Sequence, residues 1–574
     1  MLTTFTAPAF AGTWYIEDGD ITISAGESGN NVTQNENTTV NDHDTIITNR
    51  EEGASSHTVT IDAKDKDDKV EVTLKDVNID ASSRNEAAVS VTGKGDTTIE
   101  LDGDNELQGG DRHAGLEHNQ TVDGEGNVTS GKLTIQDDND NAGSLTATGG
   151  YFGAGIGGGS AKAGQVTITG GTITAISGDG AGIGGGQGNM GSNAGNADIE
   201  ISGGTIEATG GYTSAGIGGG YYGDATIKIT GDAVIKNATG GTFGAGIGGG
   251  GGGNGDVTIS GNAKIENAQG GYTGSGIGGG YGASGTVTIK DDSTVTATGG
   301  EAGAGIGGGV GGLADITIEG NATVNATGGV GSAGIGGGYD AEDDDDGTGN
   351  KITIKSNESG APTVNATGGE SSIDEETGEK IPGGAGIGSG VGDAKANITL
   401  EGKVTITATA GKDNVAIGAN GIEQEFSGLA EGSSITRYDS EGNDTSLPGD
   451  KVPVTPIVPE DTSSGGSADA SVQESVFPGL VVTDKDGQRI SYTSTQSGNT
   501  LTVCAGRFTA SLRVSLATLR QLRAEGIDTI TFQTILCSTS LSVDELLAMG
   551  GEDTEVVLTH HIRSSTLTVS GKAV

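Results

Sequence analysis

Short segments in which apolar and polar residues alternate recur along most of the chain. Ala225–Ile229 has the sequence Ala-Thr-Ile-Lys-Ile, and Ala322–Asn325 has the sequence Ala-Thr-Val-Asn. A period of two residues is typical of strands that are buried on one side only. Residues that favour turns, mainly Gly, Asn and Asp, separate these segments. The pattern predicts a chain of many short strands joined by tight turns.

A glycine-rich motif divides the strands into repeats. The sequence Gly-Ala-Gly-Ile-Gly-Gly-Gly, or a close variant, surrounds a central residue that we call the anchor, at Ile156, Ile183, Ile217, Ile247, Ile277, Ile306, Ile335, Ile387 and Ile417. Most successive anchors lie 29 or 30 residues apart. Weaker copies of the motif surround Leu116 and Val89, so we predict about eleven coils from Val89 onward. Repeats of this length indicate stacked structural units.

Stacking would align equivalent aliphatic residues, because neighbouring parallel strands lie about 4.8 Å apart. The anchors would form one inward column. Two further columns would be Ile168, Ile201, Ile229, Ile259, Ile289, Ile318, Ile354, Leu400 and Ile173, Ile206, Ile235, Ile265, Val295, Val324, Val364, Ile406. The wider gap between Ile335 and Ile387 contains two polar stretches, Asp340–Asn350 and Ser371–Lys380, which we expect to be loop insertions. We therefore predict an all-β fold, a parallel β-helix of about 29–30 residues per coil over residues 12–447, with capping coils in residues 12–85.

The end of the chain has a different character. Five of the eight prolines, the first Pro448 and the last Pro478, lie in residues 448–478, which we expect to be a linker. Residues 479–574 contain a helix-like segment, Leu516–Glu525, with Ser515 as its N-cap. A capping box, Ser542-Val-Asp-Glu, precedes a second short apolar run. Strand-like runs surround both, so we predict a small α+β domain.

Composition and charge limit the partners. Aromatic residues make up only 3% of the chain, which suits a narrow aliphatic core. The formal net charge is -47, so the chain is a poor match for nucleic acid or anionic membranes, which bind clustered Lys and Arg. Residues 476–574 carry 8 basic and 9 acidic residues, so nearly all of the excess lies in the repeats. The sequence contains no apolar run long enough to span a membrane.

Two features concern export. Ala9-Phe10-Ala11 has the small-x-small form of a signal-peptidase site, so we predict that residues 1–11 are the remainder of an export signal. Cys504 and Cys537 could form one disulfide, which an exported protein can retain.

Candidate metal and phosphate sites are weak. The glycine clusters lack the following helix and the Lys of a phosphate-binding loop, which favours structural turns. The acidic run Asp343, Asp344, Asp345 and Asp346 offers hard oxygen ligands for calcium, although its spacing differs from an EF-hand and a solvated acidic loop is the alternative. We predict no other cofactor.

An enzymatic role is not favoured. Many polysaccharide lyases and hydrolases are β-helices, and they usually place Arg, Lys or clustered Asp on one outer face. Between Arg112 and Arg437 this sequence has no Arg, and its outward positions are largely Thr and Asn. Paired carboxylates can still carry out acid–base chemistry, so hydrolysis stays open as an alternative. We predict that the protein is not an enzyme and has no catalytic residues.

The strongest binding signal is aromatic. Seven of the ten Tyr and two Phe lie four or five residues before or after an anchor: Tyr151, Phe152, Tyr212, Tyr221, Tyr222, Phe243, Tyr272, Tyr281 and Tyr339. In a stack of coils these rings would line one edge, where they could stack on sugars while Asn and Asp bind hydroxyls. The alternative is that the rings cover the turns and shield the edge of the core.

Several segments resemble a known group of proteins. These are Val72–Ala81, Thr97–Leu107, Leu145–Gly150 and the repeated Gly-Ala-Gly-Ile-Gly-Gly-Gly motif. They resemble large extracellular repeat proteins of anaerobic Gram-positive gut bacteria, described as carbohydrate-binding-domain-containing or adhesin-like. The C-terminal segments Leu541–Gly550 and Leu567–Val574 are similar to the terminal modules of those proteins. The resemblance implies a right-handed β-helix and a role at the cell surface.

We therefore expect a secreted or cell-surface, adhesin-like protein that binds carbohydrate or a host or neighbouring cell surface through one face of the solenoid. A purely structural surface stalk without a ligand is the second interpretation. A polysaccharide-active enzyme is the third.

Overall fold

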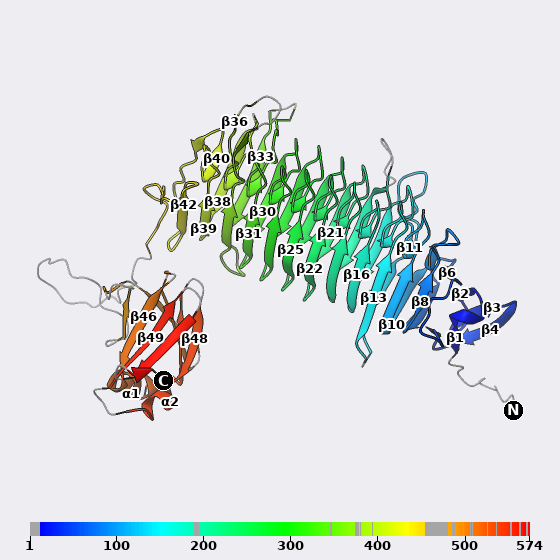
Figure 1. The fold of residues 1–574 in the computed structure, drawn as a ribbon, viewed down its shortest axis with the longest axis horizontal. Coiled ribbons are helices and arrows are strands. Elements are labelled where there is room, and N and C mark those ends of the chain that lie inside the picture. Colours follow the sequence, from blue (N-terminus) through cyan, green and yellow to red (C-terminus); the bar gives the residue numbers. More distant parts are fainter. Residues whose placement is uncertain are drawn as a thin grey trace, which may run out of the picture. The chain divides into compact units, whose positions relative to one another are not determined.

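Parallel coils wound around one continuous hydrophobic core make up most of the protein in this computed structural model (Figure 1). The structure describes residues 12–453, apart from 140, 189–194, 345–346, 374–377, 379 and 393, and residues 480–573, apart from 485–487, 491, 498, 506, 508, 525, 535–536, 551–553, 562–563 and 570–571. The chain forms two compact units, Met1–Ile457 and Val458–Val574. The break between them falls inside the predicted linker.

Each coil contributes one strand to each of three faces. Face A holds the anchors: β2 (Ile21–Ala25), β6 (Val59–Ala63), β9 (Val89–Gly93), β11 (Leu116–His118), β14 (Ile156–Gly157), β17 (Ile183–Gly184), β20 (Ile217–Gly218), β23 (Ile247–Gly248), β26 (Ile277–Gly278), β29 (Ile306–Gly307), β32 (Ile335–Gly336), β37 (Ile387–Gly388) and β40 (Ile417–Ala419). Among the described residues, the strands from β9 to β40 correspond to the eleven coils predicted from Val89 onward.

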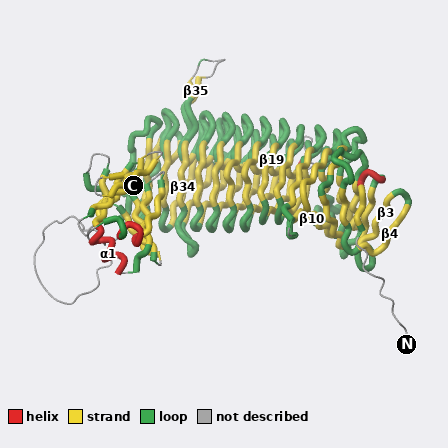
Figure 2. Tube along the Cα trace, turned by 60° about the horizontal axis from the view of Figure 1, so that its bottom comes forward, coloured by secondary structure: helices red, strands yellow, loops and turns green. Residues whose placement is uncertain are grey.

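In most coils a face B strand and then a face C strand follow the anchor strand, whereas in the described residues after β40 only the face C strand is present. Face B contains β1 (Thr13–Tyr15), β5 (Ile46–Thr48), β7 (Lys69–Lys75), the first half of β10 (Asp96–Gln108), β12 (Leu133–Gln136), β15 (Gly164–Ile168), β18 (Ala197–Ile201), β21 (Ala225–Ile229), β24 (Gly255–Ile259), β27 (Gly285–Ile289), β30 (Ala314–Glu319), β33 (Asn350–Lys355) and β38 (Ala396–Glu401). Face C contains β8 (Asn78–Asp80), the second half of β10, β13 (Gly143–Thr148), β16 (Thr172–Ile176), β19 (Thr205–Thr209), β22 (Val234–Thr239), β25 (Lys264–Gln269), β28 (Thr294–Thr298), β31 (Thr323–Thr327), β34 (Thr363–Thr367), β39 (Thr405–Thr409) and β42 (Ser434–Tyr438). In Figure 2 the face C strands β10, β19 and β34 lie in a band between two lines of turns.

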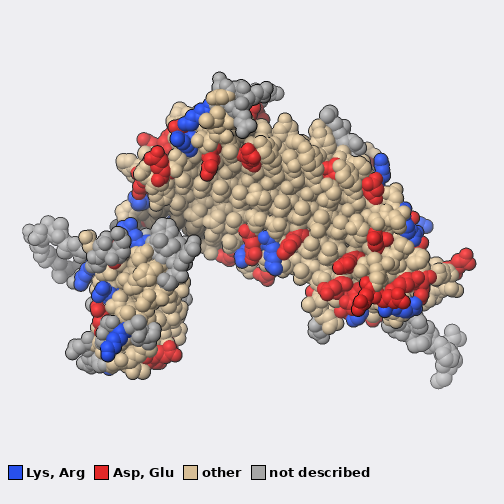
Figure 3. Space-filling model, viewed as in Figure 1, with Lys and Arg blue, Asp and Glu red and all other residues tan. Residues whose placement is uncertain are grey.

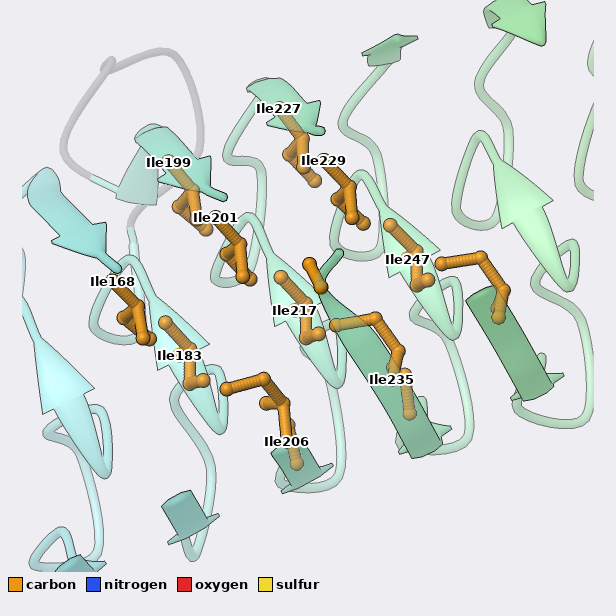
Figure 4. Close-up of a cluster of buried hydrophobic side chains, with 14 of the residues drawn as sticks. Ile168, Ile183, Ile199, Ile201, Ile206, Ile217, Ile227, Ile229, Ile235 and Ile247 are labelled. Atoms are coloured by element: carbon orange, nitrogen blue, oxygen red, sulfur yellow. The ribbon is translucent and has the colours of Figure 1, made fainter. Parts of the chain in front are cut away.

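The three predicted aliphatic columns are confirmed residue by residue. Ile201 pairs with Ile229 on face B, Ile206 pairs with Ile235 on face C, and Ile217 pairs with Ile247 on face A. Figure 4 shows these side chains pointing into the core from successive coils. All six are 0% exposed. Burying an Ile side chain stabilises a fold by about 1.5–3 kcal/mol, so these columns hold the solenoid together without aromatic residues.

The insertions lie where the wide anchor spacing placed them. The described residues 340–344 and 347–349 lie between β32 and β33. After β34 the chain carries a short antiparallel pair, β35 (Ser372–Ile373) and β36 (Lys380–Ile381). This pair projects from the line of turns in Figure 2.

The N-terminal end of the solenoid is capped by antiparallel strands. β3 (Asn30–Gln34) pairs with β2, and β4 (Asn37–Asp42) pairs with β3, so face A ends in a hairpin. The buried carboxylate of Asp42 accepts hydrogen bonds from the Gly12 amide (2.8 Å) and from Trp14 Nε1 (2.9 Å). A short 3-10 turn, η1 (Ile16–Asp18), closes the end of the core with Ile16.

The C-terminal end is capped by a buried ion-pair cluster. Arg437, on β42, occupies the inward position that Ala408 holds in the preceding coil, and it is 0% exposed. Its guanidinium donates to both oxygens of Asp450 (2.8 and 3.0 Å) and to Glu423, on β41 (Ile422–Glu423). Residues 448–453, which we had expected in the linker, therefore belong to this cap.

The C-terminal unit combines two sheets and two helices. One sheet contains β43 (Leu480–Thr483), β46 (Ala510–Ser515), β49 (Glu555–His561), β50 (Ser564–Val569) and β51 (Lys572–Ala573), and the other contains β44 (Thr493–Ser497), β45 (Thr500–Cys504), β47 (Thr529–Gln533) and β48 (Ser538–Ser542). The helices are α1 (Leu516–Ala524), capped by Ser515, and α2 (Val543–Leu547), capped by Ser542. The predicted α+β character of this unit is confirmed. In the described part of the chain, no helix is long and apolar enough to cross a membrane.

Candidate functional site

The aromatic residues lie in two turns of each coil, one on either side of the anchor strand. The C–A turn joins a face C strand to the anchor strand, as residues 270–276 do before Ile277. The A–B turn joins the anchor strand to face B, as residues 279–284 do. Hydrogen bonds connect the A–B turn of one coil with the C–A turn of the preceding coil, because Tyr281 N donates to the Phe243 carbonyl (2.8 Å) and Val310 N to the Thr273 carbonyl (2.9 Å). The two turns are therefore held side by side along the solenoid.

Glycine allows these turns to stack at the distance between strands. A Cβ on Gly271 would overlap the carbonyl oxygen of Gly241 in the previous coil. Gly278, directly after its anchor, has a φ of +132°, which side-chain-bearing residues rarely adopt. The glycine motif is thus a steric requirement of the stack, as the sequence indicated.

The nine predicted aromatic residues divide into an exposed and a partly buried group. The exposed side chains are those of Tyr151, Tyr212, Tyr272 and Tyr281, with exposed fractions of 57, 58, 55 and 49%. The partly buried ones are those of Phe152, Tyr221, Tyr222, Phe243 and Tyr339. The partly buried rings therefore fit the interpretation that aromatic side chains cover the turns, and the exposed rings stay candidates for a ligand surface.

The partly buried rings pack against other rings. The centroid of Phe243 lies 5.3 Å from that of Tyr212 and 5.8 Å from that of Tyr281, both in edge contacts. The centroids of Tyr221 and Tyr222 lie 4.1 Å apart, and Tyr221 OH donates to Tyr222 OH at 3.2 Å, which raises the pKa of Tyr221. These residues support the turns and hold the exposed rings in place.

Three exposed tyrosines form a row with a regular period. Tyr151, Tyr212 and Tyr272 each lie five residues before an anchor, and their anchors belong to every second coil. Gly178 and Thr242 occupy the same position in the coils between them. Because one coil advances the solenoid by about 4.8 Å, the rings repeat at roughly 10 Å. We call Tyr151, Tyr212 and Tyr272 the tyrosine row.

An open groove of about 610 Å³ begins at the last tyrosine of the row. Between glycines, its side-chain lining consists of Gln269, Tyr272, Glu301, Thr327, Val330 and Glu370. Gln269 Nε2 donates to the carbonyls of Gly270 (3.2 Å) and Gly299 (3.1 Å), which fixes this amide beside the groove. The groove thus offers one aromatic face, one amide and two solvent-exposed carboxylates.

A buried carboxylate lies beneath the row. Asp179, in the turn before Ile183, is 5% exposed, and burial raises its pKa. Its carboxylate accepts from the Thr213 amide (3.2 Å), from Thr213 Oγ1 (3.0 Å) and from Gln187 Nε2. These bonds fix the turn that carries Tyr212, so the role of Asp179 is structural.

The acidic loop gives calcium little support. Asp345 and Asp346 lie outside the described residues. Asp343 accepts from the amide (2.8 Å) and the ammonium group (2.6 Å) of Lys395, and this pairing lowers its pKa. Within the described residues, no group of three or more His, Cys, Asp or Glu side chains is placed to hold a metal ion.

The cysteines and histidines of the C-terminal unit are also engaged in local contacts. Cys504 Sγ donates to Gln533 Oε1 (3.2 Å), and Cys537 Sγ donates to the His561 carbonyl (3.4 Å). His560 is buried between Thr534 and Thr539, whereas His561 is exposed. The two histidines therefore point to opposite faces of β49.

Sequence reasoning did not identify the polar residues of the groove. Gln269, Glu301 and Glu370 lie on three different coils, and only the pairing register brings them together. The period of the tyrosine row, in contrast, could have been found by aligning the repeats on their anchors.

Comparison with known proteins agrees with the fold. Five segments match the family model described as beta helix repeat, at residues 141–160, 166–187, 199–221, 287–310 and 316–339, and each contains one anchor. No curated protein and no solved structure matches the chain. The resemblance to surface proteins of gut bacteria therefore stays a prediction. The coils and their register show that the chain has the fold of a β-solenoid, and the five matched segments are similar to the beta helix repeat family.

Proposed function

We propose that the protein is a non-catalytic, adhesin-like carbohydrate-binding protein of the cell surface, and that it binds sugars through the tyrosine row and the adjoining groove. The observation that carries this proposal is the exposure of Tyr151, Tyr212 and Tyr272 at the same position of three alternate coils. Large apolar side chains are normally withdrawn from solvent, so exposed rings in a regular row point to a ligand.

The chemistry of the row suits a sugar chain. A tyrosine ring offers a flat apolar face to the C–H side of a pyranose, and its hydroxyl remains in water. Gln269, Glu301 and Glu370 supply hydrogen-bond acceptors beside Tyr272 for sugar hydroxyls. A rigid scaffold places all of these groups before the ligand arrives, which lowers the entropy lost on binding.

A binding role is favoured over catalysis. Glycoside hydrolysis needs one carboxyl group whose pKa is raised beside a second carboxylate. The carboxylates of the groove, Glu301 and Glu370, are both exposed to solvent, and the buried carboxylate of Asp179 has its oxygens occupied by Thr213 and Gln187. We therefore assign the groove to recognition.

The extracellular location is part of the same proposal. Its support is the export-like segment at residues 1–11, which lie outside the described residues, together with the strongly acidic repeat composition. Detection of the chain on intact cells by surface proteolysis would support this location, and complete protection from protease would argue against it.

A glycan array with matched variants tests the binding site. We expect Tyr212→Ala with Tyr272→Ala to weaken binding about 5- to 150-fold, because each ring contact is worth about 0.5–1.5 kcal/mol and 1.4 kcal/mol is tenfold. Tyr281→Ala is the control, since it removes an equally exposed ring from the A–B turn. The assignment of the tyrosine row as the binding site would be contradicted if Tyr281→Ala loses as much glycan affinity as the double variant. It would also be contradicted if the double variant loses none.

A structural stalk is the second candidate. The uninterrupted aliphatic columns and the two capped ends suit a rigid spacer. A folded protein that binds no glycan on a broad array would support the stalk and exclude the binding proposal.

A further inference from the structure

A line of uncharged residues runs along the outer surface of face C. It consists of the outward residues at the ends of consecutive face C strands, Gln108, Thr148, Ile176, Thr209, Thr239, Gln269, Thr298, Thr327, Thr367, Thr409 and Tyr438. Each residue is the direct pairing partner of the next, so the line crosses eleven coils without interruption. We call it the neutral track.

Its lack of charge is unusual in this chain, which has 77 acidic and 30 basic residues. The other outward positions of face C include Glu106, Glu207 and Lys264, and the outward residues of face B include Glu200 and Lys228. In Figure 3, acidic side chains gather toward the N-terminal end of the solenoid, whereas a broad central band carries few charged residues. Thr favours strands and Thr pairs stabilise neighbouring strands, but this preference does not exclude charged residues, since Glu207 and Lys264 occupy other outward positions of the same face.

The neutral track is continuous with the candidate site. Tyr151, Tyr212 and Tyr272 follow Thr148, Thr209 and Gln269 by three residues, so the tyrosine row borders the track. Gln269 and Thr327 belong to the track and also line the groove. Beyond the groove the track continues over Thr367 and Thr409 to a further aromatic residue, Tyr438.

We propose that the neutral track and the tyrosine row form one binding line for an extended, uncharged polysaccharide that lies parallel to the axis of the solenoid. This inference rests on the proposed function and adds the class and the orientation of the ligand. Ten steps of about 4.8 Å give the track a length of roughly 48 Å, which requires a polymer rather than a short terminal sugar.

The chemistry of the track selects neutral sugars. A Thr hydroxyl both donates and accepts hydrogen bonds, and its methyl group contacts C–H surfaces, so a Thr column matches alternating hydroxyl and C–H groups. An anionic polysaccharide would be repelled by Glu301 and Glu370 at the groove and by the net charge of -47. Tyrosines at every second coil would contact the same side of alternate sugar units along an extended chain.

Calorimetry with the full chain tests the inference. The probes are linear, uncharged β-1,4-linked glucose and mannose oligosaccharides from disaccharide to hexasaccharide, together with a carboxymethylated glucan as the anionic comparison. We expect affinity to rise with length and the anionic polymer to bind more weakly. Thr367→Glu with Thr409→Glu should weaken hexasaccharide binding about tenfold, which corresponds to ~1.4 kcal/mol, and should leave disaccharide binding at Tyr272 unchanged.

The matched control lies in the same two coils. Thr353→Glu with Thr399→Glu places the same charges on the outward side of face B, and it should change nothing. The track would be refuted if the hexasaccharide binds no more tightly than the disaccharide, or if the face C and face B variants lose the same hexasaccharide affinity. Neither result would contradict sugar binding at the tyrosine row. Binding of no oligosaccharide in calorimetry, together with binding on the glycan array, would refute the track alone, whereas binding of no glycan in either assay would refute the proposed function and the track together. Ultracentrifugation could instead show that the wild-type protein is a dimer and that only the face C variant is a monomer. A second copy of the chain would then be the occupant of the track, and the inference would be refuted.

Discussion

The buried ion-pair cluster at the C-terminal end allows a quantitative test of how the solenoid is closed. Arg437 is 0% exposed, and Asp450, its bidentate partner, has a side chain that is 3% exposed. Replacing Arg437 by alanine removes the only cation that the described residues place on Asp450. Loss of one partner of a buried ion pair costs about 3–5 kcal/mol, because a charge is left in a poorly solvated place. We therefore expect Arg437→Ala to lower the free energy of unfolding of the last coil by that amount.

The matched control is Arg50→Ala. Arg50 also pairs with a carboxylate, Asp18, but the two side chains are 47 and 44% exposed. Exposed ion pairs contribute at most about 1 kcal/mol, so this variant should be close to wild type. A second variant, Arg437→Met with Asp450→Asn and Glu423→Gln, should recover much of the loss, because it leaves neither an unpaired charge nor a large cavity.

Hydrogen exchange measured by mass spectrometry is the suitable assay. Each coil contacts only its neighbours, so the increase in amide exchange should be largest at the end of the solenoid, over residues 434–452. It should decline to the wild-type rate within a few coils. Urea unfolding of the three variants gives the size of the effect. The assigned role of Arg437 is refuted if Arg437→Ala lowers the free energy of unfolding no more than Arg50→Ala does. It is also refuted if amide exchange rises equally along the whole solenoid.

Three other changes have outcomes that the structure specifies. Gly271→Ala should strongly destabilise the solenoid in urea because its Cβ would overlap the backbone of the previous coil, whereas Gly53→Ala, with no atom within 4 Å, should change stability by less than about 0.5 kcal/mol. Arg84 lowers the pKa of Asp20 from 3.8 to about 2, so the N-terminal cap should lose stability as pH falls from 3.8 toward 2, and Arg84→Ala should reduce that dependence in acid-unfolding curves. Burial lowers the pKa of His560 below 6.5, so the C-terminal unit should lose stability as pH falls through 6.5, an effect that His560→Gln should abolish in urea unfolding at neutral and mildly acidic pH.

The sequence was sufficient to predict the fold because two independent patterns agree in it. Period-two alternation identifies the strands, and the glycine motif gives each repeat the same starting point. Together they determine which residues stack, as the pairing of Ile201 with Ile229 and of Ile217 with Ile247 confirms. Tight steric limits around residues such as Gly271 allow little variation in this register.

The binding surface was less predictable because its residues follow no single spacing from the anchors. Glu301 lies five residues before Ile306, whereas Glu370 lies 17 residues before Ile387, because an insertion intervenes. Register shifts between β19 and β22 and between β25 and β28 further interrupt the outward positions of face C, so the neutral track could not be found by counting residues.

The C-terminal cap was missed for a different reason. Charged residues are expected at the surface, so the sequence predicts that Glu423, Arg437 and Asp450 are exposed to solvent. Arg437, Glu423 and Asp450 instead satisfy one another at the end of the core, where no further coil could cover an apolar side chain. Only the folded chain shows that the single positive charge of Arg437 is paired with both carboxylates inside this cap.

The alternation of the tyrosine row has a consequence for how such a protein can change its length. Because neighbouring coils are nearly equivalent, recombination can add or remove one whole coil without creating a new kind of junction. Loss of the single coil between Ile217 and Ile277 would bring Tyr212 and Tyr272 into adjacent coils and halve the distance between their rings. Loss or gain of coils in pairs would preserve the spacing. Whether an even or an odd number of coils is duplicated would therefore decide whether a longer descendant keeps the tyrosine spacing of the proposed site.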